Sequence, residues 1–147
     1  RNGFVCGQDN HVPTLLKHAD EIRANNPGKQ FFMIIDSLQT LDDGHFNSGR
    51  ITTATAERSL EMITDYCKEN YAIAIVVGQV TKSGKMAGSN KLKHMVDAHC
   101  HLRIEDSEKS EFFQYRVFEV PKNRFGGAGH GYVLDMTARG LREYGIL

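Results

Sequence analysis

Tryptophan is absent from the 147-residue chain, and proline and cysteine occur only three times each. The 18 Lys and Arg residues balance 18 Asp and Glu residues, which excludes a generally basic coat for nucleic acid but not a local basic loop. No apolar run approaches the roughly 20 residues of a membrane span, so we expect a soluble chain without a membrane partner. The cysteines, Cys6, Cys67 and Cys100, are odd in number and widely spaced, which excludes a disulfide framework and favours buried thiols in a reducing cytoplasm.

Length and composition favour one folded domain. Hydrophobic residues make up 40% of the chain and charged residues 24%, an ordinary globular balance, and 147 residues can bury a real core. No repeat or linker interrupts the sequence, so we expect a single domain over residues 1–147. The chain begins at Arg1, with neither an initiator methionine nor a signal segment, which we interpret as a piece of a longer chain or a processed one.

In the first half of the chain, apolar runs alternate with amphipathic segments. Strands are predicted at residues 4–6, 31–35 and 72–77, and the unbroken apolar run at 31–35 is typical of a parallel strand covered on both faces. Helices are predicted between them, one over residues 12–22 and one from a cap at Thr52 or Thr53 to near Asn70. This alternation predicts an α/β fold with a parallel central sheet flanked by helices.

The second half of the chain has a different pattern. Residues 81–95 contain four lysines and no acidic residue. Residues 98–104 alternate as in a strand, with Cys100, Leu102 and Ile104 on one face and the histidines on the other. Residues 114–120 alternate as well, and residues 131–136 form the last predicted strand. Short connections between these strands predict antiparallel hairpins appended to the parallel core.

Polar side chains follow the predicted parallel strands. Asp9, Asp36 and Gln79 would meet at one edge of the sheet, where ligands of such folds bind. A carboxylate fixed at a strand end can orient the water shell of Mg²⁺, and an amide can bond a terminal phosphate. On the pattern alone, a turn cap and a loop amide satisfied by backbone explain these residues equally well. The lysine-rich segment can likewise grip a phosphodiester backbone or be a solvated loop.

Three histidines and a cysteine, His94, His99, Cys100 and His101, crowd together and suggest a zinc site. If residues 98–104 form a strand, however, Cys100 points away from its two histidine neighbours, so the set cannot converge on one ion. We therefore expect histidines that face solvent or an interface.

Several motifs of the second half occur together and in order. They are residues 77–84 (Val-Gly-Gln-Val-Thr-Lys-Ser-Gly), 87–88 (Ala-Gly), 92–97 (Leu-Lys-His-Met-Val-Asp), 122–126 (Lys-Asn-Arg-Phe-Gly), 136–137 (Met-Thr) and 140–142 (Gly-Leu-Arg). In this combination the chain resembles the bacterial RadA (Sms) branch of the RecA-like recombination ATPases, from near Phe4 to Glu143. The pentapeptide at residues 122–126 is the most specific of these motifs.

The resemblance implies a fragment of a RecA-like P-loop NTPase core, with ATP and Mg²⁺ as cofactors. Asp36 and Ser37 are the cofactor-binding residues that it implies, and Asp36 corresponds to the acid that orients Mg²⁺ through water. Gln79 takes the sensor position, where RadA usually carries histidine and RecA carries glutamine. Asp9 is the only carboxylate in the turn where the family places its catalytic glutamate. Because Asp is one methylene shorter than Glu, slow hydrolysis is expected.

The resemblance also implies partners. Lys122 and Arg124 would reach the nucleotide of a neighbouring subunit, as an arginine finger does, in a homo-oligomeric ring or filament expected to be a hexamer. Lys82, Lys85 and Lys91 would hold the phosphates of single-stranded DNA. The family promotes branch migration during homologous recombination and DNA repair.

The chain departs from the family in what it lacks. No Gly-x-x-x-x-Gly-Lys-Ser/Thr occurs in the sequence. In the family this P-loop precedes the first strand seen here, so we expect it upstream of Arg1, and this piece alone should bind ATP poorly. The zinc module and the Lon-protease-like domain of the family are also missing. Two alternatives stay open: a non-hydrolysing DNA-binding or interaction module, and a replicative-helicase-like motor, which the pentapeptide disfavours.

Overall fold

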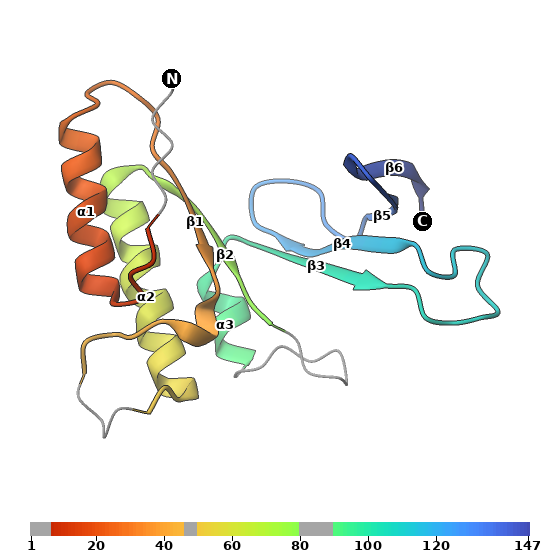
Figure 1. Ribbon diagram of the computed structural model, residues 1–147, viewed down its shortest axis with the longest axis horizontal. Helices are drawn as coiled ribbons and strands as arrows, with labels where there is room; N and C mark the ends of the chain where they lie inside the picture. Colours follow the sequence, from red (N-terminus) through yellow and green to blue (C-terminus); the bar gives the residue numbers. More distant parts are fainter. Residues whose placement is uncertain (1–6, 46–49, 80–89) are drawn as a thin grey trace. The chain divides into compact units, whose positions relative to one another are not determined.

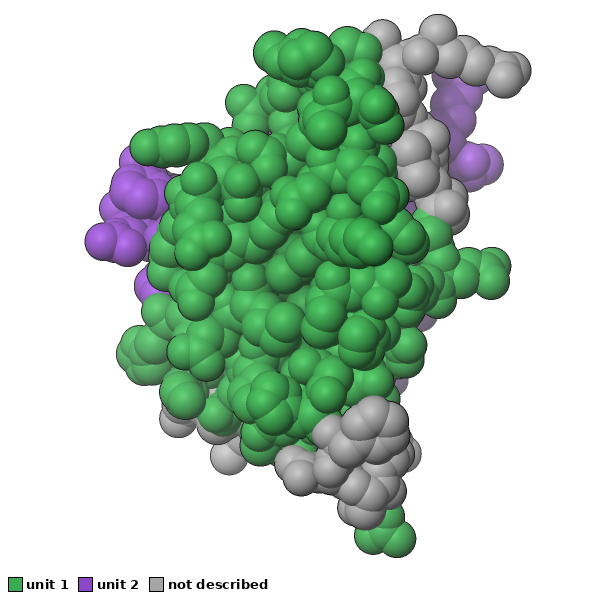
Figure 2. Space-filling view, turned by 90° about the vertical axis from the view of Figure 1, so that its left-hand side faces the viewer, with its two compact units in different colours: residues 1–95 green, residues 96–147 purple. Residues whose placement is uncertain are grey.

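A computed structural model describes residues 7–45, 50–79 and 90–147 (Figure 1). The chain divides into two compact units, residues 1–95 and residues 96–147, which Figure 2 colours separately. The strand predicted at residues 4–6 lies outside the described residues. No helix in the described part of the chain is long and apolar enough to cross a bilayer.

Unit 1 alternates helices and strands, as the sequence predicts. Its elements are α1 (Val12–Ala24), β1 (Phe32–Asp36), the short 3-10 helix η1 (Leu38–Thr40), α2 (Thr53–Asn70), β2 (Ile73–Val77) and α3 (Asn90–Met95). The strands β1 and β2 pair in parallel, with Phe32 opposite Ile73 and Asp36 opposite Val77. The prediction of an α/β fold with parallel strands is confirmed, whereas α3 was not predicted.

Helix α2 begins where the sequence predicts a cap. The hydroxyl of Thr52 accepts from the Thr55 N–H at 3.3 Å, and the Thr55 hydroxyl accepts from the Thr52 N–H at 3.1 Å. This reciprocal capping box satisfies backbone donors that a helix start leaves unpaired. The helix ends at Tyr71, whose left-handed backbone (φ +50°) stops the helical repeat.

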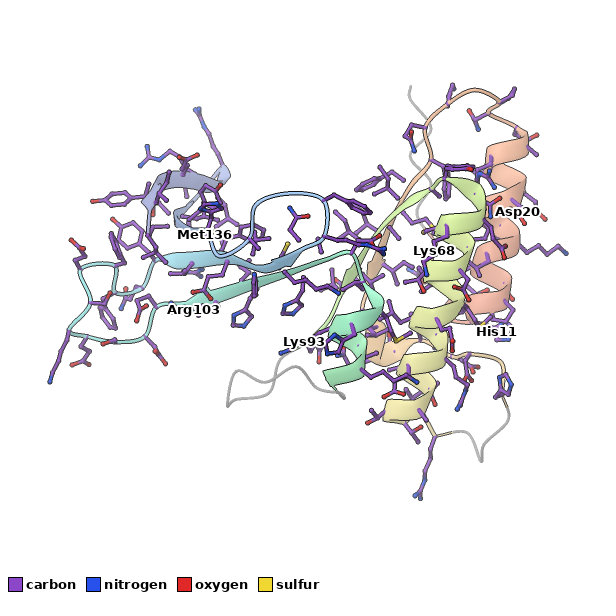
Figure 3. All side chains as sticks on the ribbon, turned by 180° about the vertical axis from the view of Figure 1, so that it is seen from behind. His11, Asp20, Lys68, Lys93, Arg103 and Met136 are labelled. Atoms are coloured by element: carbon purple, nitrogen blue, oxygen red, sulfur yellow. The ribbon has the colours of Figure 1, made fainter. Side chains whose placement is uncertain are left out.

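The core of unit 1 lies between its helices. Its buried apolar residues are Val12 and Ala19 on α1, Leu38 and Leu41 at η1, Ala56, Leu60, Ile63 and Tyr66 on α2, and Leu92 on α3. Polar bonds join the first two helices beside this core (Figure 3): the Tyr66 hydroxyl donates to Asp20 at 2.8 Å, and Arg23 donates to the Asn70 side chain at 2.7 Å. The helices of unit 1 therefore form a packed layer.

One prediction about the parallel strands is wrong. Every second residue of β1 and β2 is exposed, and the large apolar side chains on that face are between 39% and 64% exposed: Phe32, Ile34, Ile73, Ile75 and Val77. Because side chains alternate along a strand, helix packing on one face leaves the other without a cover. Among the described elements of unit 1, these strands are thus covered on one face only.

Unit 2 is an antiparallel sheet in the order β3-β4-β5-β6. Its strands are β3 (Ala98–Ile104), β4 (Arg116–Asn123), β5 (Gly131–Thr137) and β6 (Gly140–Ile146). The predicted hairpins are confirmed, but the prediction that residues 131–136 form the last strand is wrong. The Thr137 hydroxyl donates to the Gly140 carbonyl at 2.7 Å, and Gly140 has a φ of +107°, so a tight turn returns the chain into β6.

The two faces of β3 differ in polarity and in exposure. The alternation is present, but Leu102 and Ile104 are half exposed, whereas His101 and Arg103 are partly buried. Arg103 pairs with Glu119 at 3.5 Å and His101 lies 3.6 Å from the same carboxylate, so these polar residues find partners on β4 (Figure 3). The polar face of β3 is thus less exposed than its apolar face.

The expectation that each cysteine is buried is also wrong. Cys67 is half-buried and Cys100 is exposed. Burial raises the pKa of the Cys67 thiol, which keeps that thiol protonated at neutral pH. Cys6 lies outside the described residues.

A buried carboxylate fastens the segment after η1 to helix α2. The Asp43 side chain is 1% exposed; the Arg58 guanidinium donates to one oxygen and the His45 N–H donates to the other at 3.0 Å. Burial raises the pKa of Asp43, but the hydrogen bonds from His45 and Arg58 outweigh burial, so this pKa lies below its ordinary value. The carboxylate is therefore charged at neutral pH.

Arg58→Ala should lower the free energy of unfolding by about 3 kcal/mol at pH 7, because it leaves a buried charge without its partner. Lys68→Ala, which breaks an exposed pair on the same helix, should cost at most about 0.5 kcal/mol. Since the folded pKa of Asp43 lies below the unfolded value, the stabilisation is complete above about pH 4 and is lost as the pH falls further. Urea unfolding of both variants at pH 7 and pH 3 measures this; equal costs at pH 7 would contradict it.

Candidate functional site

The carboxyl ends of β1 and β2 carry the two polar residues that the sequence analysis selected. Asp36 is the last residue of β1 and lies opposite Val77, and Gln79 follows two residues later. Because the strands are parallel, both residues lie at the same edge of the sheet. Their side chains are exposed, so this edge offers a carboxylate and an amide to solvent.

A third residue, Gln39 on η1, holds this edge together. Its side-chain oxygen accepts from the Gln79 N–H at 3.0 Å, and its side-chain nitrogen donates to the Gln79 carbonyl at 3.4 Å. The carboxamide thus continues the hydrogen-bond ladder of β1 beyond Asp36, where the backbone turns away. Sequence reasoning missed Gln39, because its partner Gln79 lies 40 residues further along the chain.

Ser37 closes the turn between Asp36 and η1. Its carbonyl accepts from the Thr40 N–H at 3.1 Å and from the Thr40 hydroxyl at 2.8 Å, and the residue is 4% exposed. The Asp36–Ser37 peptide bond is cis. Ser37 therefore lies beside Asp36 in a fixed turn.

The segment that carries Asp9 runs along the chain that follows β1. His11 and Asp42 form a parallel bridge, and Asn10 donates from its side chain to the Thr40 carbonyl at 3.0 Å (His11 is labelled in Figure 3). The Asp9 carboxylate accepts from the His11 N–H at 3.0 Å, as in an Asx turn. Within the described residues, no hydrogen bond joins Asp9 to Asp36 or to Gln79.

Of the three candidate DNA-binding lysines, Lys82 and Lys85 lie outside the described residues. Lys91 lies on α3 and its side chain is exposed. Its ammonium lies 3.3 Å from the Glu57 carboxylate on α2. The lysine segment has no acid of its own, but the fold supplies one from a neighbouring helix. A sequence window could not reveal this pair, because its members are 34 residues apart.

Lys122 and Arg124 lie in unit 2, and both contact the short segment that precedes β3. The Lys122 ammonium donates to the Val96 carbonyl at 2.7 Å. The Arg124 N–H donates to the Asp97 carbonyl at 2.8 Å, and its guanidinium lies 3.4 Å from the Asp97 carboxylate. Asp36 and Gln79, by contrast, belong to unit 1.

The other members of the pentapeptide shape its turn. The Asn123 side chain accepts from the Phe125 N–H at 3.2 Å and donates to the Gly127 carbonyl at 3.3 Å. A Cβ on Gly126 would lie 2.7 Å from the Asn123 side-chain nitrogen, so a larger residue here would have to displace that amide. The Arg124 guanidinium lies 5.6 Å from the centre of the Phe125 ring, within range of a cation–π contact.

The fold of the chain is similar to that of two solved proteins. It superposes on a solved DnaB-like replicative helicase over 88% of this chain and 33% of that one (TM-score 0.74, 19% identity), and on the RadB recombinase over 86% and 57% (TM-score 0.52, 15% identity). The fold is therefore that of a RecA-like recombinase or helicase fragment.

Within that class, the sequence is similar to DNA repair protein RadA. It is 36% identical to RadA of Aquifex aeolicus over 115 residues, which are 78% of this chain and 25% of that protein. It is 34% identical to RadA of Brucella abortus over 124 residues, 83% of this chain and 26% of that protein. The resemblance to RadA is thus confirmed, and the chain spans about a quarter of the length of these relatives. No protein-family profile matches the chain.

Gln39→Ala should expose the Gln79 amide, because it removes the acceptor of that N–H. We expect hydrogen exchange at Gln79 to accelerate about three- to tenfold, the range of one net hydrogen bond. Gln39→Glu keeps the acceptor and should retain most of the protection. Gln30→Ala is the matched control, since it removes one side-chain bond, to the Tyr71 carbonyl, at the opposite end of the same strands. Unchanged exchange at Gln79 in Gln39→Ala would refute the assigned contact.

Proposed function

We propose that residues 1–147 are part of the RecA-like core of a DNA-dependent ATPase of RadA type. It would act in homologous recombination and DNA repair, as in branch migration on single-stranded DNA. The observation that carries this proposal is the parallel register of β1 and β2, which puts Asp36 and Gln79 at one edge of the sheet. The sequence similarity to RadA supports the assignment to DNA repair.

The donor set at the strand edge suits magnesium and a nucleotide. Mg²⁺ is usually held by one or two carboxylates together with substrate phosphates and water, and Asp36 offers one exposed carboxylate on a fixed strand end. Bound there, Mg²⁺ would neutralise charge on the phosphates of ATP. Asp36 would hold the ion through water, and Ser37 would keep the turn beside it closed.

Gln79 and Asp9 would act on the terminal phosphate and on the attacking water. The backbone of Gln79 is held by Gln39, so its exposed amide can reach a phosphate oxygen from a fixed position. One oxygen of Asp9 accepts from His11, which leaves the second oxygen for a water proton. Gln79 is assigned its role because it follows β2, and Asp9 because it lies in the turn before α1.

Lys122 and Arg124 would supply positive charge to the nucleotide of an adjacent subunit. This division of the site between subunits requires a homo-oligomer, a ring or a filament, for which we propose a hexamer. Lys82, Lys85 and Lys91 would contact DNA phosphates rather than bases, and binding would then depend little on sequence.

A chimera tests the assignment of Asp36. Replacing the matched segment of Aquifex aeolicus RadA by the corresponding residues of this chain supplies a P-loop, which the 147 residues do not contain. The chimera should hydrolyse ATP and respond to single-stranded DNA, and Asp36→Asn should lower its turnover by about 100-fold. Asp65→Asn, an exposed acid on α2, should leave turnover unchanged.

Steady-state phosphate release with and without DNA measures both variants. Full turnover of Asp36→Asn would remove this residue from the site. A folded chimera that binds DNA without hydrolysing ATP would favour the non-hydrolysing module instead.

The division between subunits makes a separate prediction. Chimera subunits carrying Asp36→Ala and subunits carrying Arg124→Ala should each be inactive, yet an equal mixture should regain activity. In random co-assembly roughly one interface in four combines an intact Asp36 with an intact neighbouring Arg124. ATP turnover of mixtures, with co-assembly verified by light scattering and pull-down of tagged subunits, measures this. No recovery in mixed oligomers would place both residues in the same subunit.

A further inference from the structure

The two cations of the pentapeptide are held by two adjacent residues of their own chain. Lys122 donates to the Val96 carbonyl at 2.7 Å, and the guanidinium of Arg124 pairs with the Asp97 carboxylate at 3.4 Å. Arg124 and Asp97 are 68% and 54% exposed at their side chains. The group proposed to meet a phosphate is thus already paired with an anion, at the surface, in the isolated chain.

Arg124 is held both by backbone bonds of its turn and by the side-chain pair with Asp97. Its backbone N–H donates to the Asp97 carbonyl at 2.8 Å, and the Asn123 side chain fixes the following turn through Phe125 and Gly127. None of these bonds involves the guanidinium or the Asp97 carboxylate. The turn can therefore keep its shape when the side-chain pair opens.

A carboxylate and a phosphate bind a guanidinium through the same kind of hydrogen bond and charge attraction. Both present oxygen acceptors with negative charge in a geometry that matches the planar fork of arginine. The ion pair with Asp97 is exposed, and exposed pairs are weak enough for a more highly charged ligand to displace. The Phe125 ring, 80% exposed, lies against the guanidinium and does not consume its hydrogen-bond donors.

We propose that Asp97 is an internal competitor for Arg124: it holds the guanidinium in a resting position, and a polyphosphate must displace it to engage the residue. The inference rests on the proposed role of Arg124 and adds the residue that regulates it. Asp97 is in this sense a positioning residue, because it acts through Arg124. It also lies two residues after the end of α3, the helix that carries Lys91.

The 147-residue chain itself provides the test. Arginine side-chain ¹⁵N resonances of Arg124 and Arg142 are followed while inorganic tripolyphosphate is added. Asp97→Asn removes the competing charge and keeps the carbonyl that anchors the turn, so we expect the affinity read at Arg124 to rise about two- to fivefold, the range that exposed ion pairs allow. Asp97→Glu keeps the charge and should remain near the wild-type affinity.

A matched control separates pairing from net charge. Asp135 pairs with Arg142 at 3.3 Å in the same unit, with side chains 37% and 72% exposed, and Asp135→Asn changes the net charge equally. It should leave the affinity read at Arg124 unchanged. An equal gain in Asp97→Asn and Asp135→Asn, or no gain in Asp97→Asn, would overturn the competitor role.

Arg124→Ala distinguishes this inference from the proposed function. Here the backbone amides of residues 122–127 report tripolyphosphate binding. Loss of binding in Arg124→Ala together with no gain in Asp97→Asn overturns the competitor role of Asp97. The assignment of Arg124 as a finger is then retained. Unchanged binding in Arg124→Ala overturns the finger assignment, and the role of Asp97 falls with it. In each variant, protection of the backbone N–H at position 124 from hydrogen exchange reports that the turn is intact.

Discussion

The parallel pairing of β1 with β2 is the constraint on which the candidate site depends. Parallel strands leave a sheet at the same edge, so pairing Asp36 with Val77 brings the residues that follow each strand together. The backbone alone would not keep them there, since η1 turns away directly after Asp36. The Gln39 carboxamide replaces the missing backbone partner and extends the ladder to Gln79. A single side chain therefore converts two strand ends into one rigid edge.

The elements of the first half could be predicted from the sequence because their signals are local. The Thr52 cap and the apolar runs of β1 and β2 each lie within a few residues of the structure that they specify. The exposure of one face of the strands could not be predicted, since composition shows that a side chain is apolar and not whether another element covers it. The partial burial of His101 and Arg103 likewise depends on Glu119, a partner on another strand.

The same distinction separates what could be predicted of the site. The sequence indicates Asp36 and Gln79 because they follow predicted strands. It indicates Lys122 and Arg124 because they belong to a pentapeptide motif. It does not indicate Gln39, Asp97 or the Glu57 partner of Lys91, because their roles arise from contacts across 27 to 40 residues. The missed residues share one property: each holds a selected residue in place. Sequence patterns therefore indicate candidate groups more readily than the groups that fix them.

The pentapeptide illustrates why a motif match carries physical content. Asn123 shapes the turn through its hydrogen bonds, and Gly126 leaves space for the Asn123 side chain. Lys122 and Arg124 are not required by that geometry, since any residue can supply the backbone bonds that they make. The Arg124 guanidinium is held at the surface by the Asp97 carboxylate, which a phosphate can replace, whereas the Lys122 ammonium is partly buried and donates to the Val96 carbonyl. The shape of the turn therefore depends on the Asn123 side chain, whereas the exposed Arg124–Asp97 pair lies outside that hydrogen-bonded geometry.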